Sequence, residues 1–120
     1  MPDGRLGTVE GCFAEIVWKN APLTTRELVE LCQKELNWKR TTTYTVLKKF
    51  CLRGIFDLQD RMVTVLVPKE EFFAIQSQRF VEDAFSGSLP AFIAAFTKRK
   101  QPSAKELAQI RELLDSFGEG

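Results

Sequence analysis

The 120-residue sequence contains no histidine, the side chain that most often transfers protons in enzymes. It also lacks a glycine-rich phosphate loop and any nucleophile next to a plausible base. The neighbouring acids Glu70-Glu71 and Glu82-Asp83 are typical of a solvated helix surface rather than of a catalytic pair. We therefore expect that the protein is not an enzyme.

Cysteine is scarce: Cys12, Cys32 and Cys51 are the only three, and none belongs to a Cys-x-x-Cys pair. An odd number argues against a disulfide framework, and the usual zinc-binding spacing is absent. Each cysteine falls on the apolar side of a predicted helix, so we interpret all three as core residues. The alternative is a three-thiolate metal or redox site. We expect neither a cofactor nor a bound metal.

Long apolar runs are missing as well. No stretch approaches the ~20 residues that a membrane-spanning helix needs. The first residues do not form the apolar core of a signal peptide. With 44% hydrophobic and 28% charged residues, the composition is typical of a soluble folded protein. We expect a cytoplasmic protein that does not insert into membranes.

The net charge of +1 is low for a nucleic-acid-binding protein, but the charge is unevenly distributed. Residues 1–68 hold ten Lys and Arg against eight Asp and Glu, whereas residues 69–120 hold seven against eight. Five basic residues fall within the stretch 38–54, and no acid lies between Glu35 and Asp57. The apolar residues of this stretch have helical spacing, so its other face presents cations and hydroxyls. A helix that enters the major groove of DNA needs such a face.

Three short helices are predicted in the first half of the chain. We expect them at residues 8–20, 25–35 and 41–53. A capping box formed by Thr24 and Glu27 begins the second helix, and Gly54 is suited to the position just beyond the third. The last two helices, joined by a short turn, predict a helix-turn-helix.

A β-hairpin is predicted directly after the third helix. Residues 55–58 and 62–67 are rich in strand-forming side chains and flank a short turn that ends at Arg61. A hairpin in this position makes a winged helix, with Arg61 placed to reach a phosphate or the minor groove. Pro68 closes the hairpin, so we assign a winged-helix DNA-binding domain to residues 1–68.

Residues 69–120 are predicted to be helical again. Pro90 suits the first turn of a helix, residues 98–102 form a polar turn, and Ser103 and Glu106 form a second capping box. A phenylalanine-rich segment of this size has little interior of its own. We therefore expect these helices to interlock with those of a second copy.

The predicted fold is mainly α with a small β-hairpin: a winged helix-turn-helix followed by an α-helical dimerisation domain. A two-fold dimer places two recognition helices about one DNA turn apart. A ligand pocket among the phenylalanines is the alternative. The predicted dimer-interface residues are Phe72, Phe80, Phe85, Phe92, Phe96, Ile110, Leu113 and Leu114.

Nine side chains are predicted to contact a double-stranded DNA operator. Thr42 and Thr45 suit base edges or phosphates, Tyr44 suits a thymine methyl or a phosphate, and lysines suit the backbone. A solvated helix face, a winged-helix protein–protein adaptor and a ligand- or thiol-responsive regulator are the alternatives. The predicted DNA-binding residues are Lys39, Arg40, Thr41, Thr42, Tyr44, Thr45, Lys48, Lys49 and Arg61.

The order of these features resembles the penicillinase and methicillin-resistance repressors, the BlaI/MecI family. The recognition helix of that family reads roughly Trp-Ser-Pro-Lys-Thr-x-x-Thr-Leu-x-x-Arg-Leu-x-x-x-Gly. Trp38, Thr42, Thr45 and Gly54 match this pattern, and Lys49 stands where the family has arginine.

Weaker similarities cover most of the remaining chain. They lie in residues 10–18, where Gly11 replaces a tryptophan, and in residues 88–96 and 103–114. Lys39 and Arg40 depart from the family, because they replace the Ser-Pro pair that starts the helix. Two alternatives follow from this comparison: the extra cations strengthen phosphate binding, or the helix cap moves to Thr41 or Thr42.

The resemblance implies a winged-helix dimer that binds palindromic operators and represses resistance genes. It also implies a partner, a membrane sensor protease that detects a β-lactam and leads to proteolysis of the repressor. In the family the cut falls between an asparagine and a phenylalanine. The aligned pair is Ala95-Phe96, so the asparagine is missing here.

Overall fold

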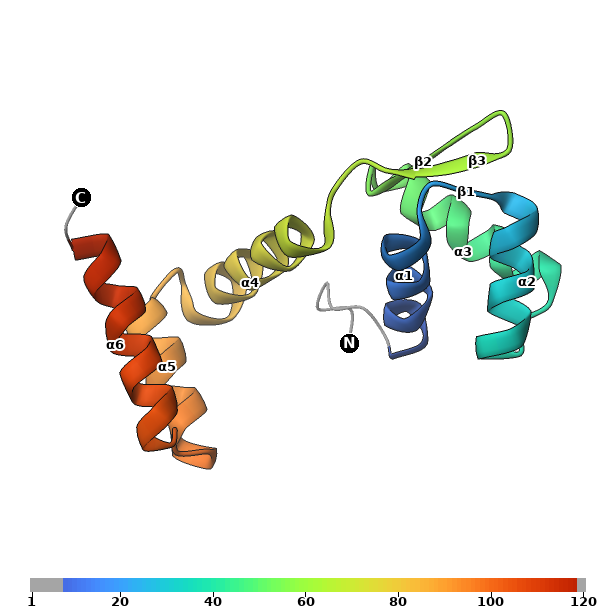
Figure 1. The fold of residues 1–120 in the computed structure, drawn as a ribbon. Coiled ribbons are helices and arrows are strands. Elements are labelled where there is room, and N and C mark those ends of the chain that lie inside the picture. The colour runs from blue at the N-terminus through green and yellow to red at the C-terminus, as the bar shows by residue number, and fades with distance from the viewer. Residues whose placement is uncertain (1–7, 119–120) are drawn as a thin grey trace. The chain divides into compact units, whose positions relative to one another are not determined.

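The structure is a computed structural model that describes residues 8–118 (Figure 1). Its elements, in chain order, are α1 (Thr8–Asn20), β1 (Leu23–Thr24), α2 (Thr25–Leu36), α3 (Arg40–Leu52), β2 (Phe56–Gln59), β3 (Met62–Val65), α4 (Lys69–Phe85), α5 (Leu89–Arg99) and α6 (Ala104–Gly118). Three antiparallel strands form one small sheet in the order β1-β3-β2. The predicted fold class, a winged helix-turn-helix followed by helices, is confirmed.

The chain divides into two compact units, and the division falls within α4, between Phe80 and Val81. The first unit therefore includes most of α4 as well as the winged helix. The boundary that we predict after Pro68 separates a DNA-binding part of the chain from a dimerisation part. The division into packed units does not test it, so it remains a prediction.

Helix α2 begins at the predicted capping box. The Glu27 amide donates to Thr24 Oγ1 at 3.1 Å, and the Thr24 amide donates to Glu27 Oε1 at 2.8 Å. This reciprocal pairing satisfies donors that the first turn of a helix otherwise leaves without partners. Asn37, with φ of 57°, ends the helix in the left-handed conformation.

Helix α3 ends where the sequence predicts. Gly54 has φ of 77°, a conformation that glycine adopts without steric cost. Its amide donates to the Cys51 carbonyl, and the Ile55 amide donates to the Phe50 carbonyl, both at 3.0 Å. The two bonds form a Schellman motif. Helix α3 starts at Arg40, one residue before the predicted start. Its cap is Lys39, which makes no side-chain capping bond, so the alternative of a cap at Thr41 or Thr42 is wrong.

The wing is a two-residue hairpin. Asp60 and Arg61 both have positive φ, 52° and 65°, which matches the right-handed twist of the flanking strands. Gln59 pairs with Met62 across the turn. Strand β1 was not predicted, because two residues carry too little pattern to reveal a strand. It pairs Leu23 with Val63 and thereby joins the wing to the start of α2.

The core of the first unit is aromatic. The Phe13 ring lies 5.4 Å from that of Phe50 and 6.3 Å from that of Phe56, measured between centroids. From α4, Phe72 packs 5.4 Å from Trp18 and is only 3% exposed. Phe72 therefore has almost no surface to offer to a second copy, and we remove it from the predicted dimer interface.

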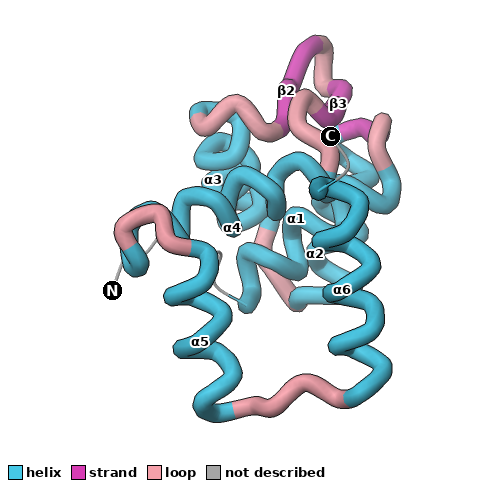
Figure 2. The backbone as a smooth tube through the Cα atoms, turned by 90° about the vertical axis from the view of Figure 1, so that its left-hand side faces the viewer, coloured by secondary structure: helices cyan, strands magenta, loops and turns pink. Residues whose placement is uncertain are grey.

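The second unit contains the end of α4 and helices α5 and α6, which run in opposite directions (Figure 2). Ser88 caps α5 by accepting from the Ala91 amide at 3.1 Å, and Pro90 lies in the first turn as predicted. Ser103 and Glu106 form the second predicted capping box. The predicted polar turn is shorter than expected, because α5 continues through residues 98 and 99.

Helices α5 and α6 contain no buried residue. Eight of their large apolar side chains are 40–71% exposed, whereas Phe92 is half-buried. The exposed apolar residues of the two helices are Leu89, Ile93, Phe96, Leu107, Ile110, Leu113, Leu114 and Phe117.

Candidate nucleic-acid interface

Helix α3 has one buried face and one open face. Its four buried residues follow the i, i+3, i+4, i+7 spacing of a helix that packs along a single stripe. These residues are Thr43, Val46, Leu47 and Phe50. The Phe50 ring stacks 5.2 Å from Phe56 of β2, so the aromatic core fixes which face of α3 is turned outward.

All nine predicted DNA-binding residues reach the surface. Tyr44 is half-buried, and the other eight are exposed: Lys39, Arg40, Thr41, Thr42, Thr45, Lys48, Lys49 and Arg61. No acidic residue occurs on α3. The open face therefore combines positive charge with hydroxyl groups, as a surface that contacts phosphates and bases requires.

A compact group of polar side chains surrounds Tyr44 near the start of α3. The Arg40 guanidinium lies 5.7 Å from the centre of the Tyr44 ring, within the range of a cation–π contact. A hydrogen bond with Thr25 is the main factor that holds the pKa of the Tyr44 phenol below its ordinary value. The positive charges of Arg40 and Arg61 lower this pKa further, against partial burial, which raises it.

Thr25 also belongs to this group, although it is not among the residues that the sequence predicted for the DNA-binding site. It is the first residue of α2 and is 7% exposed, and its amide donates to the Arg61 carbonyl at 2.9 Å. The sequence reveals only that Thr25 lies within a capping box. Contacts to residues 19 and 36 positions further along the chain leave no local signal.

Two of the predicted lysines differ in their surroundings. Lys49 Nζ lies 2.7 Å from Glu10 Oε2 of α1, an ion pair between side chains that are 58% and 31% exposed. Lys48 forms no ion pair with any residue of the described chain, 8–118. Lys48 is therefore the freer cation, whereas Lys49 also ties α3 to α1.

The threonines of α3 are of two kinds. The Thr43 hydroxyl is buried and donates to the Lys39 carbonyl at 3.2 Å, next to the helix start that lacks a side-chain cap. The exposed Thr45 hydroxyl donates to the Thr41 carbonyl at 2.9 Å. Its oxygen can still accept a hydrogen bond from a donor group on a base edge.

The three cysteines are not brought together as a three-thiolate metal site would require. Cys12 is exposed, so its predicted place on the buried side of α1 is wrong; Phe13, Ile16 and Val17 occupy that side instead. Burial raises the pKa of Cys32 and of Cys51, which disfavours the reactive thiolate. Residues 8–118 hold no group of side chains with metal-binding geometry.

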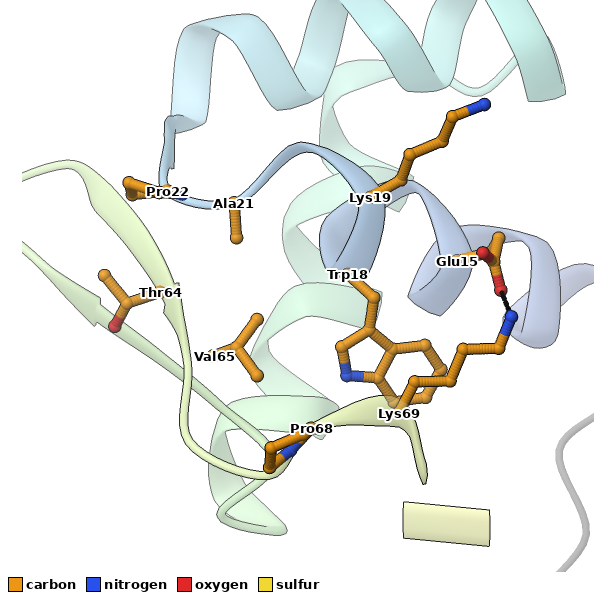
Figure 3. A pocket seen from close by; sticks show the side chains of 9 residues that line it. All are labelled: Glu15, Trp18, Lys19, Ala21, Pro22, Thr64, Val65, Pro68 and Lys69. Atoms are coloured by element: carbon orange, nitrogen blue, oxygen red, sulfur yellow. Dashed lines mark ion pairs between the residues drawn. The ribbon is translucent and has the colours of Figure 1, made fainter. Parts of the chain in front are cut away.

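A groove of about 720 Å³ lies between α1, β3 and the beginning of α4 (Figure 3). Trp18 forms part of its wall and donates its indole N–H to the Val67 carbonyl at 3.1 Å. An ion pair of 2.7 Å between Lys69 and Glu15 lies at one side. No phenylalanine and none of the predicted DNA-binding residues line this groove.

Within residues 8–118, none of the helices combines the length and the apolar character that a membrane span requires.

Comparison with known families identifies the chain. A family model described as penicillinase repressor matches residues 6–116. The chain belongs to the penicillinase repressor family. The resemblance noted in the sequence is thereby confirmed, and so is the prediction that the protein is not an enzyme. A member of this family is a DNA-binding transcriptional repressor, and membership favours DNA binding over the adaptor alternative.

Two relatives show how far the similarity extends. The penicillinase repressor of Bacillus licheniformis is 21% identical over 105 residues, which cover 84% of this chain and 82% of the relative. The methicillin resistance regulatory protein MecI of Staphylococcus aureus strain Mu50 is 19% identical over 115 residues. These residues cover 92% of this chain and 94% of the relative. Both alignments therefore extend across the winged helix and the C-terminal helices.

Proposed function

We propose that this protein is a homodimeric repressor that binds a palindromic operator through α3 and the wing, and that it controls β-lactam-resistance or related genes. The observation that carries the proposal is the open face of α3, where cations and hydroxyls are exposed while four core residues fix the helix orientation. Operator DNA lies in the cytoplasm, so we place the protein there.

Dimerisation through the C-terminal helices is supported by their exposed apolar side chains. Five of the eight predicted interface residues are 40–58% exposed: Phe80, Phe96, Ile110, Leu113 and Leu114. Phe85 and Phe92 are half-buried, with ring centroids 5.7 Å apart. Apolar surface of this extent is typical of an interface that a second copy covers.

Release from DNA by proteolysis after a membrane-sensor signal is the proposed mode of induction. The candidate bond, Ala95-Phe96, lies within α5, and both side chains are exposed, Phe96 at 54%. A protease reaches a peptide bond in an extended conformation, so cleavage there requires α5 to unwind locally.

The test of operator binding is the dependence of affinity on salt. With duplex DNA from upstream of the protein's own gene as the probe, we expect tight binding that falls steeply as salt rises, with a slope of log K against log salt of about −4 or steeper. A slope near zero contradicts phosphate contacts and, with them, the proposal.

A charge reversal on α3 locates the contact. Lys48→Glu is expected to weaken binding to operator and random DNA alike and to reduce the slope by about 2 per dimer, because each protomer loses one phosphate contact. Lys34→Glu, which changes an exposed lysine in the last turn of α2, is the matched control and should change neither affinity nor slope. Equal effects of the two substitutions place the DNA elsewhere than on α3.

A further inference from the structure

Lys49 differs from the other cations of the proposed DNA surface because it has an acidic partner. Its Nζ donates to Glu10 Oε2 at 2.7 Å, the length of a charge-assisted hydrogen bond. Among the nine predicted DNA-binding residues, only Lys49 forms an ion pair with another residue of the described range, 8–118. One cation of this surface is therefore already bound to an oxyanion of the protein itself.

The aromatic core holds these two charges opposite each other. Phe13 lies one helical turn after Glu10, and Phe50 directly follows Lys49. The two rings are buried, with centroids 5.4 Å apart. Glu10 lies in the first turn of α1 and Lys49 in the last turn of α3, where the helix dipoles favour an acid and a base, respectively. The packing of α1 against α3 thus brings the two side chains together.

Lys49 also belongs to the face of α3 that the proposed function turns toward DNA. Thr42, Thr45 and Lys49 are spaced i, i+3 and i+7, so they follow one side of the helix. The Lys49 side chain is 58% exposed, whereas that of Glu10 is 31% exposed. The same ammonium group can therefore meet either the carboxylate or a DNA phosphate. A carboxylate at hydrogen-bond distance cancels much of the attraction that the ammonium exerts on a second anion.

We propose that Glu10 is an internal competitor of DNA: its carboxylate occupies Lys49 and thereby restrains the affinity of the repressor for DNA phosphates. Glu10 need not touch DNA. To bind a phosphate, Lys49 exchanges one ion pair for another, which adds little affinity and releases few counterions. Phosphates carry no sequence information, so the restraint acts on operator and random DNA alike. This inference rests on the proposed operator binding.

Removal of the carboxylate is the test. Glu10→Gln keeps the length of the side chain and removes its charge. Glu15→Gln is the matched control, because Glu15 lies on the same helix and forms an ion pair of the same length, 2.7 Å, with Lys69 of α4. Both changes alter the net charge equally. Affinity and salt slope are measured with duplex DNA from upstream of the gene and with a random duplex of equal length, together with the thermal midpoint of unfolding.

We expect Glu10→Gln to bind both duplexes about 3- to 10-fold more tightly at low salt, because each protomer of the dimer gains one free cation. The salt slope should become steeper by about 2 per dimer. Glu15→Gln should stay within about 2-fold of the wild type, with an unchanged slope. The two changes each remove one exposed ion pair between helices, so they should lower the thermal midpoint by similar small amounts.

A second set of variants shows whether Glu10 acts through Lys49. In a chain that already carries Lys49→Gln, addition of Glu10→Gln should leave the salt slope unchanged and raise the affinity much less, because no cation remains to be freed. The matched background is Lys48→Gln. Lys48 is not paired with Glu10, so the full gain from Glu10→Gln should persist there.

Four results overturn the inference. Weaker binding by Glu10→Gln shows that the ion pair orients Lys49 for DNA instead of withholding it. Unchanged binding shows that Lys49 meets no phosphate. Equal gains for Glu10→Gln and Glu15→Gln show an effect of net charge alone. An equal gain with and without Lys49 shows that Glu10 repels DNA directly.

Failure of this inference is distinguishable from failure of the proposed function. If the wild-type protein binds DNA with a steep salt slope and Glu10→Gln gives any of these four results, operator binding stands and the role of Glu10 falls. If the wild type shows no salt-dependent binding at all, the proposed function falls first.

Discussion

The two units of this protein differ in whether their apolar side chains are buried. In the first unit, aromatic rings from α1, α3, β2 and α4 meet in a closed core, and every buried apolar residue of the described chain lies between Phe13 and Phe72. In the second unit, helices α5 and α6 contain no fully buried residue. The first unit has the interior of an independently stable domain, whereas the apolar residues of the second are arranged for a partner.

The difference shows that apolar content alone does not indicate where a core lies. Phe13 and Phe117 are both phenylalanines on apolar helix faces, yet Phe13 is fully buried and Phe117 is 71% exposed. Burial depends on whether other elements of the same chain cover the face. The following changes test this contrast, beginning with the largest expected effect.

Phe13→Ala should destabilise the first unit by about 3–5 kcal/mol, because it removes a fully buried ring from an aromatic cluster. Urea unfolding followed by tryptophan fluorescence is the measurement, since both tryptophans, Trp18 and Trp38, lie in the first unit. Phe117→Ala is the control and should leave this transition unchanged at protein concentrations where the chain is monomeric. Equal effects of the two changes remove the distinction between the units.

Leu114→Asp should weaken dimerisation at least about 100-fold, because it places an unpaired charge in each half of a two-fold apolar interface. Sedimentation velocity across a range of protein concentrations measures the shift, and the fluorescence transition of the first unit should not move. Lys105→Glu, on the opposite face of α6 by helical spacing, is the control. A wild-type chain that stays monomeric at micromolar concentration contradicts the proposed role of the second unit.

Glu27→Gln removes one capping charge from helix α2 of the first unit. Of the three changes, it should have the smallest effect on stability. Hydrogen bonds from the Thr24 backbone and side chain lower the pKa of Glu27 below its reference value of 4.5. The ionised cap therefore contributes its full stability above pH 4.5, and this contribution is lost as the pH falls through the lower pKa of the folded state. Wild type should exceed the variant in stability at neutral pH and lose this advantage in acid, as followed by tryptophan fluorescence. Glu30→Gln, on the same helix but outside the cap, should not change this pH dependence.

Many elements of the fold could be predicted because their signals are local. Thr24 and Glu27, or Ser103 and Glu106, are three residues apart, and Gly54 acts on the turn that it terminates. Such pairings form within one helical turn and depend little on the rest of the chain. The outward face of α3 was predicted for the same reason, since residues spaced at i, i+3 and i+4 share a face.

Long-range pairings could not be predicted in this way. The sequence places Phe72 with the dimerisation residues, but the ring packs against Trp18, 54 positions earlier. Cys12 has the spacing of a core residue, yet Phe13, Ile16 and Val17 already occupy the covered side of α1. Which of several apolar residues on a helix is covered depends on where the neighbouring elements pack.

The sequence by itself determined that a capped helix-turn-helix is followed by a hairpin and by apolar helices, and it determined which residues of α3 are polar. Only the tertiary structure decided which groups meet: Thr25 with Tyr44 and Arg61, Glu10 with Lys49, and β1 with β3. The physical reason is distance along the chain. Local backbone preferences and caps act within a few residues, whereas contacts between residues 19 to 40 positions apart exist only after the aromatic core has set the orientation of each helix.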